Sequence, residues 1–259
     1  ATVEATGASV FNINAIMAGD LEFGIAQADR QYQAYNGLSE WEGKPQKDLR
    51  AVFALAPEAV TFVAAEDSGI KSLKDLKGKR IELIAAGDGV EVCSRKVVES
   101  IGLNWDDVKH EYSGNRVQAS SRLKTGQVDA IIDGTGVGAA WISDILKSGK
   151  FHLLAMTQEE MEQIMKANHE FSAMPIPANS YGGQDATIPT VGNWTIITCS
   201  ADLPEEVVYN LTKIFHTEKD KLKAAHAFFK DIAPANIKGA VIAPLHPGAE
   251  KFYKEAGVL

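Results

Sequence analysis

The sequence predicts an α/β fold in two lobes, and three observations support this prediction. Apolar segments of strand length alternate with segments of helical periodicity along most of the chain, a pattern typical of mostly parallel sheets. A chain of 259 residues is long for one hydrophobic core and sufficient for two. The alternation stops at residues 174–189, which are rich in Pro, Gly and Asn. We therefore expect one lobe from residues 1–66 and 190–259 and another from residues 67–189, with two crossing strands near 59–66 and 190–199 as the hinge.

The first part of the chain contains mainly strands. Residues 2–6 have the alternation of a strand, and residues 10–18 have helical spacing. The apolar strand over 21–26 ends at Gln27, and the polar stretch after it, rich in Gln and Tyr, is typical of a loop. A short amphipathic helix is expected between residues 67 and 80. The remaining strands expected in this part are 49–55, 59–65 and 81–86.

The second part alternates more regularly and then becomes mainly helical. Pro204 suits the first position of a helix, so we expect a helix to begin there. The expected helices are 90–101, 117–124, 138–147, 158–168, 204–215, 219–230 and 247–256, and the expected strands are 108–112, 128–133, 152–155 and 190–199.

Composition excludes several classes of partner. The hydrophobic content of 45% and the charged content of 23% are ordinary for a globular protein. A net charge of -8 argues against nucleic acids and anionic membranes, because both attract basic surfaces. Cys93 and Cys199 are expected to be separate buried thiols, and neither lies in a cluster with His that would suggest a metal site.

A glycine-rich corner after a buried strand is the strongest candidate binding feature. The strand over 81–86 leads into Gly-Asp-Gly at 87–89, where a second helix begins. Backbone N–H groups at such a helix start can bind a carboxylate or a phosphate. We therefore predict that Asp88, Gly89, Val90 and Glu91 contact a ligand, against the alternative of a structural glycine turn.

Polar residues follow other predicted strands in the same way. Thr135 and Gly136 come after the strand over 128–133, and Asp133 is expected to place a carboxylate nearby. Gln27 ends its strand, and ligands of open α/β sheets bind beyond the carboxyl ends of strands. Ser9 and Asn12 lie where a helix begins, so they are candidates both for a helix cap and for ligand contact.

The remaining candidates have plausible structural roles. Tyr181 can pack against the apolar part of a ligand or against the core. Arg95, Arg116 and Arg122 lie on predicted helices, where a solvated charge is the default. No nucleophile is paired with a base and an orienting group, so we predict a binding protein without a cofactor rather than an enzyme. An enzyme on the same fold, or the effector lobe of a regulator, are the alternatives.

Six segments together resemble one family. The segments are 5–12, 24–29, 35–37, 67–80, 182–185 and 244–253, and they follow the expected order along essentially the whole chain. They resemble the TAXI family of extracytoplasmic solute-binding subunits of TRAP transporters. The resemblance implies a two-lobed type II periplasmic-binding-protein fold and a monomer in the periplasm or outside the membrane. It also implies a small carboxylate ligand, glutamate-like or a dicarboxylate, and TRAP membrane subunits as partners.

The chain differs from that family at its start. Family members begin with a strand, a glycine-rich loop and a helix, whereas this sequence starts at what resembles the second strand. We therefore expect one βα unit of roughly 30 residues to be missing from the first lobe, and the full-length protein to bind solute better than these residues alone.

The charges near the predicted site favour an amino acid as the ligand. Asp88 and Asp133 add carboxylates, and no arginine is clearly placed to bind a second ligand carboxylate. A glutamate- or glutamine-like ligand would place its ammonium among these acids. Dicarboxylates and keto acids are the alternative.

Overall fold

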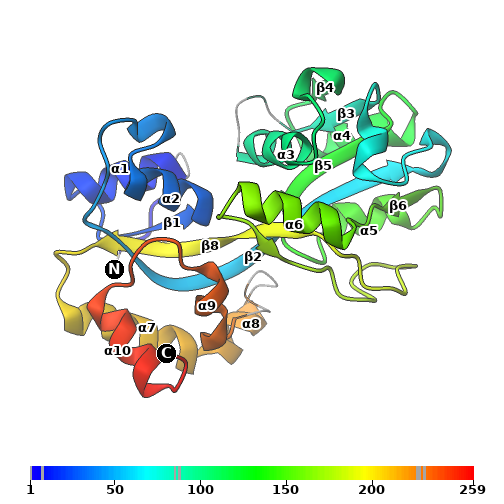
Figure 1. Ribbon diagram of the computed structural model, residues 1–259. Coiled ribbons are helices and arrows are strands. Elements are labelled where there is room, and N and C mark those ends of the chain that lie inside the picture. Colours follow the sequence, from blue (N-terminus) through cyan, green and yellow to red (C-terminus); the bar gives the residue numbers. More distant parts are fainter. Residues whose placement is uncertain (1, 7–8, 85, 87–88, 226–228, 230–231) are drawn as a thin grey trace. The chain divides into compact units, whose positions relative to one another are not determined.

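The computed structural model describes residues 2–6, 9–84, 86, 89–225, 229 and 232–259 (Figure 1). The chain divides into two compact units: unit 1 is Ala1–Pro57 with Asn193–Leu259, and unit 2 is Glu58–Gly192. It passes from unit 1 to unit 2 within strand β2 (Leu49–Ala65) and returns near the start of strand β8 (Val191–Ser200). The sequence predicts these passages after residues 66 and 189.

Unit 1 is a three-stranded sheet with helices on both faces. Strand β1 (Phe23–Gln27) pairs antiparallel with β8, from Phe23 opposite Cys199 to Gln27 opposite Thr195, and β8 neighbours β2. Helices α1 (Ser9–Ala18) and α2 (Ala28–Asn36) lie on one side, and α7 (Glu205–Thr217) and α10 (Pro247–Glu255) lie on the other (Figure 1). The short helices α8 (Lys219–Ala225) and α9 (Ile237–Ala240) complete the described part of the unit.

The core of unit 1 lies between the sheet and the α7–α10 pair. Phe53 of β2 stacks on Phe215 of α7, with ring centroids 3.9 Å apart, and Tyr253 of α10 is fully buried beside them. Helix α10 can approach α7 closely because Gly248 has no side chain. A Cβ atom there would lie 2.2 Å from the carbonyl oxygen of Glu205.

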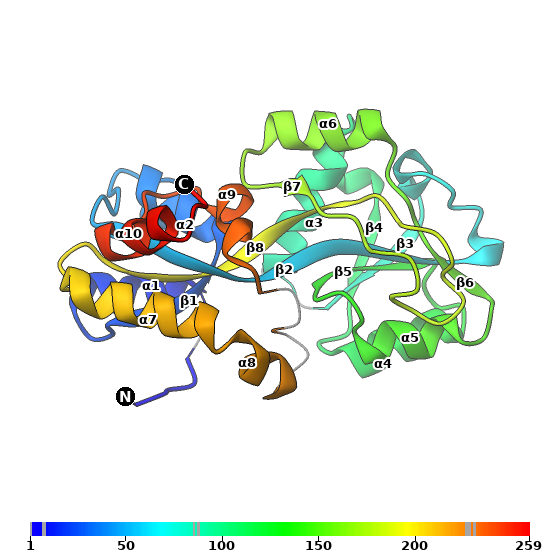
Figure 2. The same ribbon diagram turned by 90° about the horizontal axis from the view of Figure 1, so that it is seen from below.

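Unit 2 is a mixed sheet with parallel pairing among its described strands. Strand β3 (Arg80–Leu83) pairs parallel with both β4 (Lys109–Tyr112) and β5 (Ala130–Thr135), while β5 pairs antiparallel with β2. Figure 2 shows α3 (Gly89–Ser100) and α6 (Gln158–Ala167) on one face, and α4 (Arg116–Lys124) and α5 (Ala140–Leu146) on the other. Two short strands, β6 (Phe151–Leu153) and β7 (Ser172–Ala173), pair antiparallel with β2 and β8. The carboxyl ends of β3 and β5 therefore lie at one edge of the sheet.

The α/β fold class is confirmed, and four local predictions are wrong. Residues 2–6 form no strand, and they are exposed. The predicted loop after Gln27 is helix α2, the predicted strands 49–55 and 59–65 are one continuous strand, and the expected amphipathic helix is a single 3-10 turn at Leu73–Leu76. Strand β2 continues through Pro57 because its pairing with β5 begins only at Ala59, so the missing N–H of proline is not needed on that side.

The cysteines are separate buried thiols, as predicted. Cys93 lies in the core of unit 2 and Cys199 in the core of unit 1. Burial raises the pKa of the Cys199 thiol to about 12, so this thiol is not a reactive nucleophile at neutral pH. Within the described ranges, no helix is long and apolar enough to cross a membrane.

Candidate functional site

In unit 1, three of the predicted residues lie together where β1 ends and α1 begins. The Ser9 hydroxyl accepts a hydrogen bond from the backbone N–H of Gln27 at 3.1 Å. Asn12 is buried, accepts from the Thr6 hydroxyl at 2.6 Å and donates to the carbonyl of Ile25 at 2.8 Å. Asn12 therefore ties helix α1 to strand β1, which makes its role structural. Ser9 and Gln27 lie at the edge where the sequence predicts the ligand.

Helix α2 begins directly after Gln27 and buries an unusual number of polar residues. Asp29, Arg30, Gln31 and Gln33 are all buried. The amide nitrogen of Gln31 donates to the hydroxyl of Thr198 at 3.1 Å, which links α2 to β8. Sequence reasoning missed this helix because its buried face is polar and shows no apolar periodicity. The signal that could have found it is Gly37, which ends the helix in the left-handed conformation (φ 68°).

In unit 2, the predicted corner leads into the first turn of α3. Asp88 lies outside the described residues, and Gly89, Val90 and Glu91 form the start of the helix. The side chain of Val90 lies 3.9 Å from where a Cβ of Gly134 would be, so the helix start lies beside the end of β5. Glu91 is buried and forms an ion pair with Arg95 at 3.2 Å, one turn later.

The end of β5 carries Thr135 and Gly136, and just before them lies an ion pair with a buried carboxylate. Asp133 is fully buried, and Nε and Nη2 of Arg116 bind its two carboxylate oxygens at 2.5 and 3.1 Å. Asp133 therefore does not present the uncompensated negative charge that the sequence suggests. Arg116 is not a merely solvated charge, although 45% of its side chain is exposed.

The other two helical arginines are also paired. Arg95 binds Glu91, and Arg122 binds Glu82 at 2.9 Å and also Glu111. Because Glu82 is fully buried in β3, Arg122 of α4 supplies its counter-charge. The expectation that these arginines are simply solvated is wrong.

Tyr181 belongs to the same part of unit 2. Its ring is buried, and its hydroxyl accepts a hydrogen bond from the backbone N–H of Gly138 at 3.1 Å. Burial raises the pKa of Tyr181, and Asp133 acts in the same direction. The hydroxyl therefore stays protonated and holds the chain after Gly136 in place.

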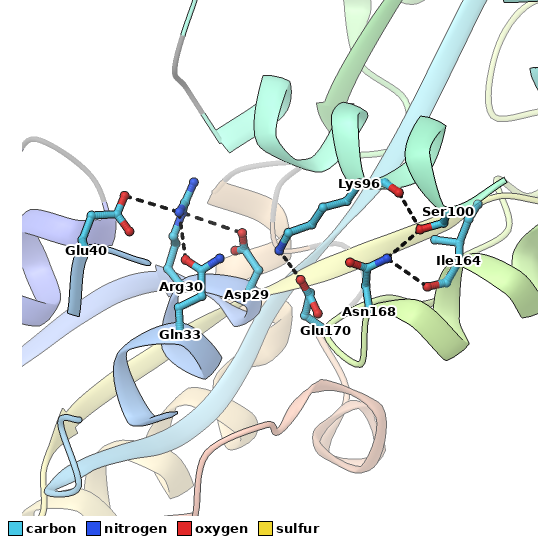
Figure 3. A network of polar contacts seen from close by, with 9 residues as sticks. All are labelled: Asp29, Arg30, Gln33, Glu40, Lys96, Ser100, Ile164, Asn168 and Glu170. Carbon is cyan, nitrogen blue, oxygen red and sulfur yellow. Dashed lines mark hydrogen bonds and ion pairs between the residues drawn. The ribbon is translucent and has the colours of Figure 1, made fainter. Parts of the chain in front are cut away.

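A separate network fixes the far part of α3 in unit 2 (Figure 3). Lys96 pairs with Glu170, and the amide nitrogen of Asn168 donates to the Ser100 hydroxyl at 2.8 Å and to the carbonyl of Ile164 at 3.2 Å. These contacts tie α3 to the end of α6. These contacts therefore fix the position of α3, and with it the position of the helix start at Gly89 and Val90.

A cavity of about 700 Å³ lies at the opposite edge of the unit 2 sheet, where β3 and β5 begin. It is lined in part by Arg80, Asp129, Lys124 and Lys150, and it includes none of the predicted site residues. The Arg80 guanidinium donates two hydrogen bonds to the Asp129 carboxylate, at 2.5 and 3.2 Å, and the backbone N–H of Arg80 donates a third at 2.8 Å. Among the described residues, no group of three or more His, Cys, Asp or Glu side chains could hold a metal ion.

The chain has the fold of a solved periplasmic binding protein, which is described below. Residues 1–257 match the model of the NMT1-like family, and the chain belongs to that family.

Solved structures with this fold share little sequence with the chain. The periplasmic aliphatic sulphonate binding protein SsuA from Escherichia coli matches with a TM-score of 0.50 and 15% identity, over 93% of this chain and 64% of that one. XAC2383 from Xanthomonas citri bound to a chloride ion matches with a TM-score of 0.51 and 12% identity, over 94% of this chain and 82% of that one. The same protein bound to ATP matches with a TM-score of 0.50 and 11% identity, over 93% and 82%. The chain thus spans 64% of the length of SsuA, and these likenesses concern the fold.

Proposed function

We propose that the protein is a periplasmic or otherwise extracytoplasmic solute-binding protein that captures a small carboxylate-bearing solute and delivers it to a membrane transporter. The observation that carries this proposal is the start of α3, where Gly89 and Val90 lie beside the end of β5. A helix start offers free N–H groups and a favourable dipole for an anion. The fold of periplasmic binding proteins supports the same conclusion.

The paired acids near this helix start bear on the charge of the solute. Glu91 is matched by Arg95 and Asp133 by Arg116, so neither repels a ligand carboxylate at full strength. This removes one argument for an amino acid over a dicarboxylate. We keep a glutamate- or glutamine-like amino acid as the first candidate and a dicarboxylate or keto acid as the alternative.

A sulphonate is the second candidate class of ligand. It is favoured by the likeness to SsuA, which is described as an aliphatic sulphonate binding protein. XAC2383 was also found with anions, chloride and ATP. A sulphonate presents three oxygens and one negative charge, so it would use the same N–H groups as a carboxylate.

The proposed partners are the membrane subunits of a TRAP transporter, which the motif resemblance suggests. We propose no catalytic activity, because among the described site residues none forms a nucleophile–base pair. An enzyme would need a catalytic group, and the effector lobe of a regulator would need a fused nucleic-acid-binding segment. The residues described here point to neither.

Calorimetric titration of the full-length protein tests the ligand class. The solutes are glutamate, glutamine, 2-oxoglutarate, succinate and ethanesulphonate, each at the same pH and ionic strength. We expect saturable binding of at least one carboxylate and no turnover of any of them. Glutamate and 2-oxoglutarate differ chiefly at the amino position, so their order separates amino acid from keto acid.

Three results would change the proposal. Binding of ethanesulphonate without any carboxylate would establish the second candidate, and saturable turnover would make the protein an enzyme. The resemblance to TRAP solute-binding subunits implies transport driven by a sodium gradient, so solute uptake by membrane vesicles containing the transporter should follow that gradient. Uptake that requires ATP would exclude a TRAP partner.

A further inference from the structure

A buried arginine in unit 1 has hydrogen-bonding capacity that its neighbours do not use. Arg30, in the first turn of α2, is only 6% exposed. Its Nη1 donates to the side-chain oxygen of Gln33 at 2.9 Å and lies 3.5 Å from a carboxylate oxygen of Glu40. Its Nε lies 3.7 Å from a carboxylate oxygen of Asp29, which is an ion pair but too long for a hydrogen bond.

The second terminal nitrogen, Nη2, has no acceptor among the residues that the structure describes. The contacts drawn in Figure 3 reach Arg30 from Gln33, Glu40 and Asp29, and the end of the guanidinium without a contact points away from Gln33 and Asp29. A guanidinium has five N–H donors in a fixed planar arrangement. Nη2 is not among the fully enclosed side-chain atoms that lack a partner, so it lies in the small exposed part of the side chain, where a solute can reach it.

The position of Arg30 is the one expected for a ligand residue. It follows Gln27 by three positions, at the carboxyl end of β1, where Ser9 also lies. The side chain is held on one side by Gln33 and Glu40, so the direction of its free edge is set before a ligand arrives. Because the guanidinium is already held in place, its Nη2 group loses little conformational entropy when it binds a ligand.

We propose that Arg30 is a ligand-binding residue that takes an oxyanion of the solute, a carboxylate or a sulphonate, on Nη2. This deepens the proposed function and rests on it. The alternative is that Arg30 serves only as the counter-ion of Asp29. That role needs only a positive charge, which lysine also supplies, and it would leave the Nη2 donors of the guanidinium unused. Because Asp29 and Glu40 flank Arg30, the three side chains together carry one net negative charge. The site therefore favours a singly charged or zwitterionic solute over a dianion.

The conservative variant Arg30→Lys tests the proposal, because it keeps the charge and removes the planar donors. Arg50→Lys is the matched control in unit 1, since Arg50 binds backbone carbonyls of Lys47 and Leu49. The wild type and both variants are titrated with glutamate, 2-oxoglutarate and ethanesulphonate by calorimetry, and their melting is followed by circular dichroism. We expect Arg30→Lys to weaken binding of the best solute by about tenfold or more, and Arg50→Lys to leave it unchanged. Binding by Arg30→Lys within about twofold of the wild type would overturn the proposal.

Two further measurements keep the proposal decidable. If Arg30→Lys does not fold, the double variant Asp29→Asn/Arg30→Gln removes the pair together and is titrated instead, with the same expected loss. If the wild type binds none of the solutes, the proposed function fails, and Arg30 is then tested with sodium methanesulphonate, a singly charged oxyanion. Methanesulphonate should raise the melting temperature of the wild type more than that of Arg30→Lys, and equal shifts would exclude an oxyanion site at Arg30.

Discussion

Arg116 of α4 binds both carboxylate oxygens of Asp133, at 2.5 and 3.1 Å, at the carboxyl end of β5. Asp133 is fully buried while Arg116 is nearly half exposed, so the guanidinium also shields the carboxylate from one side. Two parallel N–H···O bonds fix both the distance and the orientation of the pair. The pair thereby holds α4 against the strand that ends in Thr135.

Replacing Arg116 by glutamine should destabilise the protein. The change leaves the buried carboxylate of Asp133 without its counter-charge, which costs about 1–3 kcal/mol; water near the exposed arginine keeps the loss within this range. Urea unfolding measures the change in the free energy of unfolding. The double variant Arg116→Gln/Asp133→Asn removes both charges and should recover part of the loss. A double variant less stable than Arg116→Gln would contradict the pairing.

Tyr181→Phe should loosen the attachment of the segment after β5 and leave the packing of the aromatic ring unchanged. Only the hydroxyl that accepts from the N–H of Gly138 is removed, and the expected loss of stability is about 1 kcal/mol. If Thr135 and Gly136 contact the solute, the looser segment should also lower its affinity several-fold. Thermal melting and calorimetry separate the two effects. Lower stability with unchanged affinity would restrict Tyr181 to a structural role.

The pH dependence of stability should contain a contribution from His216. Its Nε2 lies 3.0 Å from the hydroxyl of Tyr253 in the core of unit 1, and burial, with Lys219 adding to it, lowers the pKa of His216 from 6.5 to about 4. The neutral form is favoured in the folded state, so its stabilising contribution is complete above pH 6.5 and is lost as the pH falls from 6.5 through 4. Between pH 7.5 and pH 4.5 the wild type should lose about 2–3 kcal/mol from this group.

His216→Phe is the variant that isolates this effect. Phenylalanine does not titrate, so the free energy of unfolding of the variant should fall less over the same pH range, whatever its stability at neutral pH. Urea unfolding at both pH values gives the comparison. Equal losses in the wild type and the variant would show that His216 does not titrate on unfolding.

Gly192→Ala should be strongly destabilising at the start of β8. An added Cβ would lie 2.3 Å from the carbonyl oxygen of Glu58 and 3.0 Å from the Cα of Ala59, and backbone atoms cannot move away cheaply. We expect a loss of about 1–3 kcal/mol. Gly182→Ala is the control, because a Cβ there would meet nothing within 4 Å. Melting temperatures that fall equally in both variants would contradict this packing.

Most elements of the fold could be predicted because their apolar periodicity reports their burial. Helix α2 could not, because most of its buried side chains are polar and have partners in distant parts of the chain or in each other; these are Asp29, Arg30, Gln31 and Gln33. The sequence predicts two strands, 49–55 and 59–65, on either side of Pro57, because proline usually ends a strand. Only the pairing partner reveals that the missing N–H is not required.

In the candidate site, too, some residues could be predicted from local sequence, whereas others depend on tertiary packing. Ser9, Gln27, Gly89 and Thr135 could be selected because each lies at the end of a strand or the start of a helix. The pairing of Arg116 with Asp133 and the burial of Arg30 depend on the packing of helices on sheets. Helical spacing cannot distinguish such arginines from solvated ones.

Strand β2 has a consequence for how the protein unfolds. Its residues up to Pro57 belong to unit 1 and those from Glu58 belong to unit 2, and most of them are buried. If one unit unfolds and its half of β2 detaches, the strand that the other unit shares with it is disturbed as well. The two hydrophobic cores should therefore melt in a single cooperative transition, with equal calorimetric and van't Hoff enthalpies, although each core has its own helices.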